Sequence, residues 1–246
     1  MRKHFCLVIP TYNERENIAK VISRIDNIRS KLAFELSLIV VDDGSTDGTV
    51  EYVKNAIDNS EGWIELLERP NLLGIGAAYL DGFTLGRAQL ETHYYGEMDA
   101  DLQHPPETLF DMCEKANSGV DVVIASRYVD GGGSTSWSLS RRIVSRTANI
   151  LAKLSIRSPV SDSTSGFRIL SSRAVLNLLQ SKVSSKGYSF QIESLYVYKK
   201  AGMTFAEVPY TFEERKSGVT KLNWKEMARF AIVALRVGIF GTRKAN

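Results

Sequence analysis

Residues 36–49, LSLIVVDDGSTDGT, contain the structural unit that the rest of the chain repeats. An apolar run over 36–41 stops at the polar loop 42–49, and apolar residues then recur at helical spacing over 50–57. The run is continuous rather than alternating, which is typical of a strand covered on both faces of a sheet, with helices as crossovers. This segment therefore predicts one strand, loop and helix unit of an α/β protein.

The same pattern recurs on both sides of that unit. Further strands are predicted over 5–9, 63–67, 94–98 and 120–125, and further helices over 18–28, 76–86, 137–154 and 224–241. Such a series predicts an α/β fold with a mostly parallel sheet flanked by helices, in which ligands bind beyond the carboxyl ends of the strands. We expect one α/β domain over 1–223, followed by a helix and tail over 224–246.

Composition limits the kinds of partner. The 246 residues are 43% hydrophobic, enough for one large domain or a domain with an extension. A net charge of +3 is too small to argue for nucleic acid. Without a run of 18 uncharged apolar residues, no membrane-spanning helix is expected. Cys6 and Cys113 lack metal-like spacing, so we interpret them as buried free thiols of a cytosolic protein.

Residues 97–106, EMDADLQHPP, contain two carboxylates and a carboxamide at the end of a predicted strand. Alternate residues of an extended chain point the same way, so we expect Asp99, Asp101 and Gln103 to converge. Three oxygen donors suit Mg²⁺ or Mn²⁺, which bind substrate phosphates through one or two protein carboxylates. The alternative is a solvated acidic turn closed by Pro105.

Three acidic loops, at 12–14, 42–43 and 99–103, are predicted to face one crevice, because each follows a strand. Crowded carboxylates repel one another, and a metal ion or a hydrogen-bonding base or ribose makes such a cluster tolerable. Asp43 and Glu14 could accept hydrogen bonds from a nucleoside. Their alternative role is to cap the helices that follow.

Other known nucleotide or metal motifs are not supported. The segment 74–76, GIG, lacks the third glycine of a dinucleotide-binding loop, so we interpret it as a close-packing site. No P-loop sequence occurs, and the three histidines are too scattered to indicate a zinc site.

Basic residues follow in two segments. Arg141 and Ser145 lie four apart in the predicted helix 137–154, so they share a face and can hold one phosphate. For Arg142 and Arg146, a solvated basic face is the alternative. The segment 213–221, EERKSGVTK, reads as a polar loop that can close over a diphosphate, with a plain exposed loop as its alternative.

The last predicted helix, 224–241, is amphipathic. Its apolar residues, interrupted by arginines, include Phe230, Val233, Val237 and Phe240. We expect these side chains to insert into the surface of a membrane, with nearby basic residues attracted to anionic headgroups. Docking on the catalytic domain or on a membrane partner subunit remains the alternative.

Three of these segments, 8–14 (VIPTYNE), 41–49 (VDDGSTDGT) and 98–103 (MDADLQ), resemble family 2 glycosyltransferases of the GT-A fold. Within that family the chain is most similar to the dolichyl-phosphate (polyprenyl-phosphate) mannosyltransferases. The similarity runs from about Phe5 to Trp224. It continues through 125–128 (ASRY), 140–142 (SRR), 162–168 (DSTSGFR), 187–193 (GYSFQIE) and 207–209 (EVP). Each motif alone occurs in many family members, but the ordered set is specific.

The resemblance implies a role for each matching residue. The guanosine of GDP-mannose would be held by Pro10, Tyr12, Glu14, Val41 and Asp43. The metal and diphosphate would be held by Asp99, Ala100, Asp101 and Gln103, with Mg²⁺ or Mn²⁺ bound by Asp99, Asp101 and Gln103. The donor would also be contacted by Arg215 and Lys221, and the acceptor phosphate by Arg127, Arg141 and Ser145. Catalysis would depend on Asp99, Asp101, Arg127 and Arg215.

The implied function is that of a hexosyltransferase. It would transfer mannose from GDP-mannose to dolichyl (polyprenyl) phosphate with inversion, giving dolichyl β-D-mannosyl phosphate for glycan assembly. One alternative is a family 2 enzyme that uses UDP-glucose or another nucleotide sugar with the same acceptor. The other is an inactive sugar-nucleotide-binding module, which both aspartates and the basic loop disfavour. 

The implied partners include a membrane surface and small membrane subunits, and exclude nucleic acid. The expected location is cytoplasmic and peripheral, on the cytoplasmic face of the endoplasmic reticulum in a eukaryote or of the cell membrane otherwise.

Overall fold

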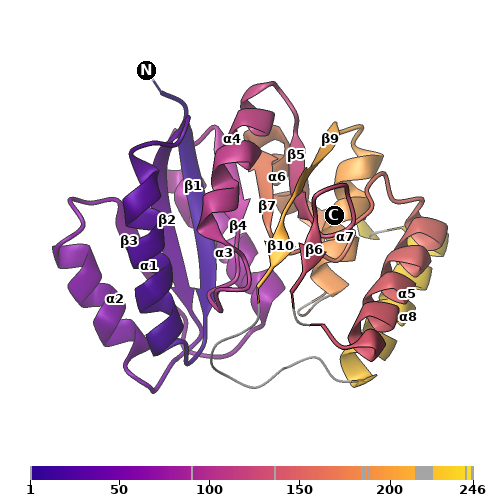
Figure 1. Cartoon of the computed structure of the whole chain (residues 1–246), viewed down its shortest axis with the longest axis horizontal. Helices are drawn as coiled ribbons and strands as arrows, with labels where there is room; N and C mark the ends of the chain where they lie inside the picture. Colours follow the sequence, from indigo (N-terminus) through magenta and orange to yellow (C-terminus); the bar gives the residue numbers. More distant parts are fainter. Residues whose placement is uncertain are drawn as a thin grey trace.

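A computed structural model describes residues 2–89, 91–135, 137–183, 185, 187, 189–213, 224–241 and 243–244. Seven strands of this part form one sheet in the order β3-β2-β1-β4-β7-β5-β9 (Figure 1). Their bounds are β1 His4–Thr11, β2 Glu35–Asp42, β3 Ile64–Glu68, β4 Tyr94–Glu97, β5 Val122–Ser126, β7 Arg168–Ser171 and β9 Phe205–Pro209. The predicted strands are confirmed, and β7 and β9 are additions to them.

Helices cover both faces of the sheet. The helices α1 (Arg15–Arg29), α2 (Thr49–Asp58) and α4 (Leu109–Asn117, after a short 3₁₀ turn Pro106–Thr108) pack on one face. The other face carries α3 (Ile75–Gln89), α6 (Ser172–Leu179) and α7 (Ser189–Lys200). Beyond them α5 (Leu139–Ile156) and α8 (Trp224–Phe240) lie side by side, at the right of Figure 1. The two-sided cover explains why the strand sequences are continuous apolar runs.

One strand breaks the parallel pattern. β7 runs antiparallel to both of its neighbours, β4 and β5, and it places Arg168 opposite Glu97 and Ile124. The other described pairs in this sheet are parallel. The sheet is therefore mostly parallel, as predicted, and its two parallel parts are joined through β7.

Short strand pairs complete the described structure. β6 (Gly133–Ser134) pairs with β10 (Thr211–Phe212), and β8 (Ser181–Lys182) pairs with β11 (Arg243–Lys244). The first pair brings the segment before α5 next to the end of the β9 region. This places the start of α5 close to the residues that follow β9.

Two expectations about buried groups are confirmed. Cys6 and Cys113 are both buried free thiols. Gly76 lies against Phe190, since a Cβ built there would stand 2.7 Å from the Phe190 ring, so the glycine is a close-packing site. None of the helices in the described part of the chain is long and apolar enough to cross a bilayer.

The apolar face of α8 differs from the expected one. Phe230, Ala234 and Val237 are buried against the domain, and Arg236 forms a 3.1 Å ion pair with the buried Glu193 of α7. The prediction that Phe230 and Val237 reach into a membrane is therefore wrong, although Phe240 remains exposed. The sequence did not discriminate between the two faces because α8 carries apolar residues on both.

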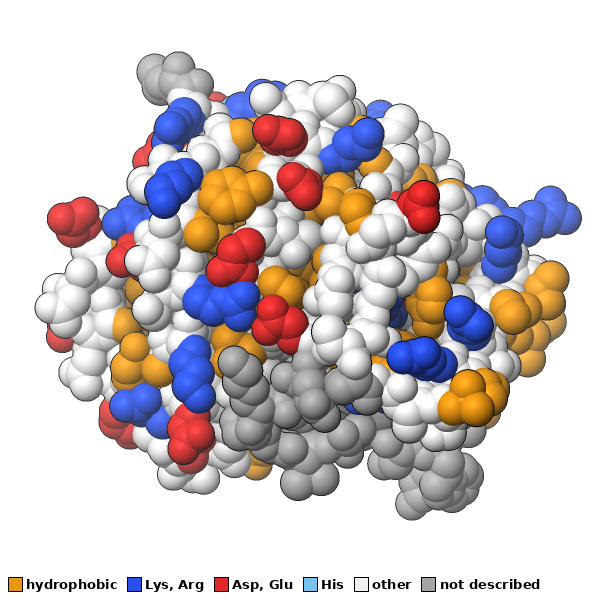
Figure 2. All heavy atoms as spheres, in the orientation of Figure 1, with side chains coloured by type: hydrophobic (Ala, Val, Ile, Leu, Met, Phe, Trp, Pro, Cys, Tyr) orange, Lys and Arg blue, Asp and Glu red, His pale blue; other side chains and the backbone are white. Residues whose placement is uncertain are grey.

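The outward faces of α5 and α8 form one exposed apolar surface, which we call the α5–α8 face. Its apolar members are Leu139, Ile143, Ile150 and Leu154 on α5 and Ile232, Leu235, Ile239 and Phe240 on α8. Exposed basic residues beside them are Arg142, Arg146, Lys153 and Arg229. Figure 2 shows hydrophobic side chains gathered at this side of the molecule with Lys and Arg side chains among them. 

Candidate active site

Three polar loops meet at one edge of the sheet. They follow β1, β2 and β4, which are neighbours and run parallel, so their carboxyl ends lie side by side. The backbone N–H of Asp43 donates to the Thr11 carbonyl at 3.0 Å, which links the first two loops. The predicted grouping of 12–14, 42–43 and 99–103 at a common edge is confirmed by this strand order.

Asp42 shapes the loop that follows β2. Its Oδ1 accepts hydrogen bonds from the backbone N–H groups of Gly44 (3.1 Å) and Ser45 (2.8 Å). Its Oδ2 accepts from the Thr11 hydroxyl at 2.8 Å and the Ser45 hydroxyl at 2.6 Å. Because both oxygens of this buried carboxylate are engaged, Asp42 acts on the loop and not on a ligand.

Asp43 is held by an arginine that the sequence did not single out. The Nε of Arg69 donates to Asp43 Oδ1 at 2.6 Å, and its Nη2 lies against the same oxygen. Arg69 also donates to Asp81 at 3.0 Å and is itself buried. The guanidinium of Arg69 therefore holds one oxygen of Asp43 in place. It fixes the orientation of this carboxylate, which lies at the carboxyl end of β2.

The other predicted nucleoside contacts fall into two groups. Tyr12 and Glu14 lie in the loop after β1; Tyr12 is partly exposed, and Glu14 accepts a 2.7 Å hydrogen bond from Asn17. Pro10 and Val41 are register partners inside the sheet, and the Val41 side chain is fully buried. Val41 can therefore contact a ligand only through its backbone, whereas Tyr12 and Glu14 can use their side chains.

The acidic motif after β4 is a bent loop. The strand ends at Glu97, and Leu102 adopts a left-handed φ of 66°. Asp101 Oδ1 accepts a hydrogen bond from the Gln103 backbone N–H at 3.1 Å. Because the chain turns here, the side chains of residues 99–103 do not alternate as they would along a strand. The expectation that Asp99, Asp101 and Gln103 converge by alternating along an extended strand is therefore wrong in its geometry, because the chain is not extended there.

The donor set of this loop nevertheless fits a divalent cation. Asp99 has 31% of its side chain exposed, while Asp101, Gln103 and Ala100 are buried. Among the described residues, no three His, Cys, Asp or Glu side chains are arranged to hold an ion by themselves. Mg²⁺ and Mn²⁺ at a diphosphate need only one or two carboxylates, since waters and phosphate oxygens supply the other ligands. Two carboxylates and one carboxamide satisfy that requirement.

Buried charge lies directly beneath the loop. Burial raises the pKa of Glu97 to about 7, although the charge of Arg168 and a 2.9 Å hydrogen bond from Gln191 favour the carboxylate. Arg168 is fully buried and donates to the Gln191 carbonyl, among other groups. Tyr79 donates to Asp99 Oδ1 at 3.3 Å, and burial together with Asp99 raises the pKa of Tyr79 well above its usual value. The phenol therefore remains a donor to Asp99.

Arg127 is engaged by a buried carboxylate. Its Nε and Nη2 donate to the two oxygens of Asp162, each at 2.6 Å, and Nη2 also donates to Thr164 at 2.7 Å. Burial alone would raise the pKa of Asp162, but the charge and hydrogen bonds of Arg127 outweigh it and lower that pKa. Among the described residues, none accepts a hydrogen bond from Nη1 of Arg127. A phosphate could therefore be bound only through that remaining edge.

Arg127 and Arg141 share one aromatic platform. The Arg127 guanidinium lies 5.0 Å from the Trp137 ring centre and 5.5 Å from that of Phe212, and Arg141 lies 4.8 Å and 5.4 Å from the same two rings. Each cation is within the range of attraction to an aromatic face. Ser145 lies one turn further along α5 and is partly buried. The structure thus brings the two predicted arginines together.

The acidic loop and the platform are in contact. His104 lies edge-on to Phe212, with ring centres 6.2 Å apart. The Glu213 backbone N–H donates to the Gln103 carbonyl at 3.3 Å, so the chain at the end of β10 reaches the acidic loop. Arg215 and Lys221, the predicted donor contacts, lie outside the residues that the structure describes.

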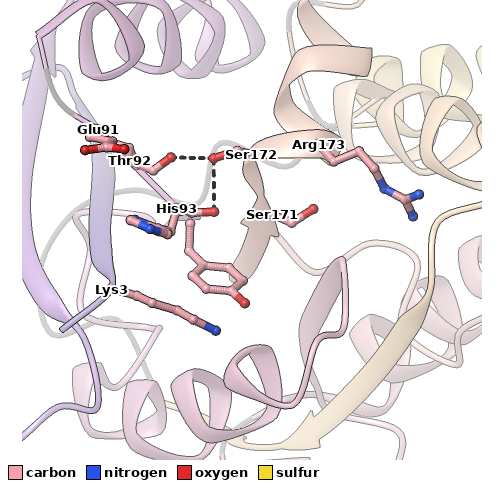
Figure 3. Close-up of a pocket in the computed structure, with 8 residues that line it drawn as sticks. Lys3, Glu91, Thr92, His93, Ser171, Ser172 and Arg173 are labelled. Carbon is pink, nitrogen blue, oxygen red and sulfur yellow. Dashed lines mark hydrogen bonds between the residues drawn. The ribbon is translucent and has the colours of Figure 1, made fainter. Parts of the chain in front are cut away.

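A pocket of about 440 Å³ lies at the opposite edge of the sheet (Figure 3). It is lined by Lys3, Glu91, Thr92, His93, Tyr94, Ser171, Ser172 and Arg173. The Ser172 hydroxyl donates to the carbonyls of Thr92 and His93 there, and the Arg173 guanidinium is paired with Asp121. The start of β4 and the end of β7 form this edge, so the pocket is separate from the acidic loops.

Sequence reasoning missed Arg69 and His104. Arg69 follows β3, so its position at a strand end was a usable signal. His104 lacks the spacing of a zinc ligand, and nothing in the local sequence indicates its contact with Asp99. Asp162 lies within a family motif, but its pairing with Arg127 has no local signal because the two residues are distant in sequence.

An acidic loop at the carboxyl end of a central strand, beside a pair of arginines, forms the candidate ligand-binding edge of this α/β fold. The chain belongs to glycosyl transferase family 2, whose profile matches residues 6–179, and it is a glycosyltransferase. 

Two characterised relatives are similar over most of the chain. Polyprenol monophosphomannose synthase of Mycolicibacterium smegmatis is 35% identical over 237 residues, which cover 96% of this chain and 87% of the relative. Dolichol-phosphate mannosyltransferase of Pyrococcus furiosus is 33% identical over 226 residues, covering 91% of this chain and 60% of the longer relative. 

Solved structures share the fold at low identity. Glucosyl-3-phosphoglycerate synthase from Mycobacterium tuberculosis, solved with Mn²⁺, UDP and glucosyl-3-phosphoglycerate, gives a TM-score of 0.66 at 20% identity, covering 96% of this chain and 80% of that one. A mannosyltransferase from Pyrobaculum calidifontis, solved with GDP-Man and Mn²⁺, gives 0.62 at 17% identity, covering 100% of this chain and 66% of that one. The GT-A fold is therefore confirmed.

Proposed function

We propose that the chain transfers mannose from GDP-mannose to a polyprenyl phosphate, such as dolichyl phosphate, with inversion at the anomeric carbon. The observation that carries the proposal is the contact of the acidic loop, through Gln103 and the following His104, with the Arg127–Arg141 platform. This contact supports a diphosphate site beside a site for a second phosphate. The relatives named for mannose transfer to polyprenol and dolichol phosphate support this choice of substrates.

The proposed chemistry needs little acid–base catalysis. An acceptor phosphate oxygen attacks the anomeric carbon, the bond from that carbon to the β-phosphate oxygen breaks, and its electron pair leaves with GDP. The phosphate is anionic at neutral pH, so the main tasks are alignment and stabilisation of the departing charge. A bound Mg²⁺ or Mn²⁺ would supply Lewis-acid neutralisation of the diphosphate.

In this proposal each part of the site has one task. Tyr12, Glu14 and Asp43, with the backbone near Pro10 and Val41, bind the nucleoside. Asp99, Asp101 and Gln103 hold the cation, with Arg215 and Lys221 as further donor contacts. The acceptor phosphate is bound by Arg141, Ser145 and the Nη1 edge of Arg127, whose other donors are used by Asp162 and Thr164.

The experiment that tests the function compares donors. Purified protein is incubated with polyprenyl phosphate, Mg²⁺ or Mn²⁺, and radiolabelled GDP-mannose or UDP-glucose, and the label that enters the lipid phase is counted. We expect transfer from GDP-mannose alone. Transfer from UDP-glucose would support the other nucleotide-sugar activity, and binding of GDP-mannose without transfer would support an inactive module.

The role of Arg141 gives a prediction that separates the two substrates. Arg141→Ala removes a charge-assisted contact to the acceptor, a loss of about 1.5–3 kcal/mol, so transfer at low acceptor concentration should fall by roughly 10- to 100-fold. GDP affinity measured by calorimetry should remain unchanged, because the donor does not use this residue.

Arg87 is the matched control, since it is an exposed arginine near the end of α3 and belongs neither to the platform nor to the α5–α8 face. Arg87→Ala should leave both the acceptor KM and GDP affinity within about twofold, as for ordinary surface charges. Loss of GDP binding in Arg141→Ala would instead assign this residue to the donor.

We also propose that the α5–α8 face binds an anionic lipid surface on the cytoplasmic side of a membrane. The charge of the face supports binding to an anionic lipid surface. The basic residues Arg142, Arg146, Lys153 and Arg229 border the apolar residues, and each basic group near an anionic leaflet contributes about 1 kcal/mol to binding. The position of the proposed acceptor site also supports lipid binding, because Arg141 lies on α5, the same helix that forms part of this face. A lipid acceptor bound at Arg141 would then have its chain near the bilayer.

Removal of apolar groups tests that face. Ile150→Ser/Leu154→Ser should weaken co-sedimentation with vesicles containing phosphatidylserine by about tenfold or more, since each buried CH₂ contributes roughly 0.8 kcal/mol. Transfer to a short water-soluble acceptor should be retained. The measurement is the vesicle-bound fraction at low and high salt.

Leu72→Ser/Leu73→Ser is the matched control, because these leucines are exposed in the loop after β3. It should bind vesicles as the unmodified protein does. If Ile150→Ser/Leu154→Ser also bound vesicles normally, lipid binding by the α5–α8 face would be excluded. A protein subunit would then be the remaining partner for this face.

A further inference from the structure

The imidazole of His104 faces Asp99 through both of its nitrogens. The backbone N–H of Asp99 donates to Nδ1 at 3.1 Å, and Nε2 stands 3.9 Å from Asp99 Oδ2. Because Nδ1 accepts, the neutral ring carries its proton on Nε2, the side that faces the carboxylate. One side chain thus holds the main chain of Asp99 and presents a donor toward its carboxylate.

Packing fixes the orientation of that ring. His104 is buried and stacks on Phe167, with ring centres 5.1 Å apart and planes inclined by 18°. Tyr210 and Phe212 contact it edge-on at 6.0 Å and 6.2 Å. With three aromatic neighbours in place, the imidazole cannot turn without displacing core side chains.

One carboxylate oxygen of Asp99 has a hydrogen-bond donor. The Tyr79 hydroxyl donates to Oδ1 at 3.3 Å, and the Tyr79 ring is fully buried between Phe83 and Phe190. Gly166 lies on the same side: a Cβ added there would stand 3.9 Å from Asp99 Oδ1 and 3.9 Å from His104 Cε1. Tyr79 and His104 thus flank the carboxylate on the protein side.

We propose that His104, assisted by Tyr79, is a positioning residue that orients Asp99 for a divalent cation at the donor diphosphate. The proposal rests on the proposed function, because it assumes that Asp99 binds the cation. A carboxylate that can rotate freely loses conformational entropy when it binds an ion, whereas one already held does not. Outer-shell partners of this kind typically change metal affinity by about 10- to 100-fold when removed.

Two substitutions of His104 separate its interactions. His104→Phe keeps the aromatic packing and removes both nitrogens. His104→Asn offers an amide oxygen near the former Nδ1, so it can still accept from the Asp99 N–H. We expect Mn²⁺ affinity, measured by electron paramagnetic resonance in the presence of GDP, to fall about 10- to 100-fold in the Phe variant. The Asn variant should recover at least part of that loss.

Tyr79→Phe tests the other flank without altering the packing. It should weaken Mn²⁺ binding in the same assay by several-fold. Its matched control is Tyr94→Phe, which removes a buried hydroxyl bonded to the Ala116 carbonyl at 2.9 Å, away from the acidic loop. The control should leave Mn²⁺ affinity unchanged, although it can lower the melting temperature.

The outcomes separate this inference from the proposed function. If the unmodified protein binds GDP and Mn²⁺ together, and His104→Phe and Tyr79→Phe bind Mn²⁺ equally well, the positioning role is wrong while metal use stands. If the unmodified protein itself shows no Mn²⁺ binding with GDP, both are wrong. Should His104→Phe fail to fold, the Mn²⁺ affinity of His104→Asn, compared with those of Tyr79→Phe and Tyr94→Phe, decides the question: an affinity equal to that of the unmodified protein in both His104→Asn and Tyr79→Phe would overturn the positioning role.

Discussion

Asp101→Asn is expected to reduce sugar transfer to below about 1% of the unmodified rate, a loss of roughly 3 kcal/mol in transition-state stabilisation. The physical reason is the charge on the donor. A cation held by Asp99 and Asp101 would lose one anionic ligand, so the charge on the departing diphosphate would be less well neutralised. Asparagine keeps an oxygen that can accept from the Gln103 N–H, so the turn at 101–103 is retained.

The measurement is turnover with GDP-mannose and calorimetry of GDP with and without Mn²⁺. The affinity for GDP should fall only in the presence of the metal, by about 1 kcal/mol or more. Asp111→Asn, an exposed acid of α4, is the control and should behave as the unmodified protein. Full turnover of Asp101→Asn in EDTA would rule out a metal-dependent diphosphate site at this loop.

Asp162→Asn is expected to destabilise the fold by about 3–5 kcal/mol, because it leaves the buried Arg127 charge without its counter-ion. The side chain of Asp162 is fully buried, and that of Arg127 is 10% exposed. Urea unfolding monitored by circular dichroism measures the free energy difference. The exposed pair Lys54–Glu68 provides the control: Glu68→Gln should cost at most about 1 kcal/mol.

Two further results would identify charge as the cause. The pKa of Asp162 is lowered in the fold, so its contribution is present above the unfolded value of 3.8 and is lost as pH falls through the folded value. The difference in the free energy of unfolding between the unmodified protein and Asp162→Asn should therefore be constant near neutral pH. It should shrink below pH 3.8. Arg127→Met/Asp162→Leu, which removes both charges, should be more stable than Asp162→Asn. If it were less stable, packing and not charge would explain the loss.

Much of the fold follows from local sequence. The apolar runs 5–9 and 36–41 are strands because their residues must be covered on both faces, and the helical spacing after each one identifies the crossover. β7 is different: it has four residues, begins with a buried arginine and runs antiparallel to both of its neighbours, β4 and β5. Its position depends on pairing with segments far away in sequence, which no local period encodes.

The site shows the same division. Acidic side chains at strand ends are visible in the sequence, so the edge that carries Asp43 and Asp99 was predicted. The turn at Leu102 was not, because its left-handed backbone is rare for leucine and has no local signal. The Arg127–Asp162 pair also depends on tertiary contact. Local pattern identifies the strand ends, and packing decides which groups meet there.

The position of β7 has a consequence for synthesis of the chain. Once residues up to Glu97 have left the ribosome, β3, β2, β1 and β4 can pair, but the outer edge of β4 has no partner until residues 168–171 follow. β5 must also wait, since its neighbours are β7 and β9. During that interval the nascent chain exposes an unpaired strand edge, a template for association with other chains. Translation that pauses before residue 168 should therefore favour aggregation, whereas a pause after β9 should not.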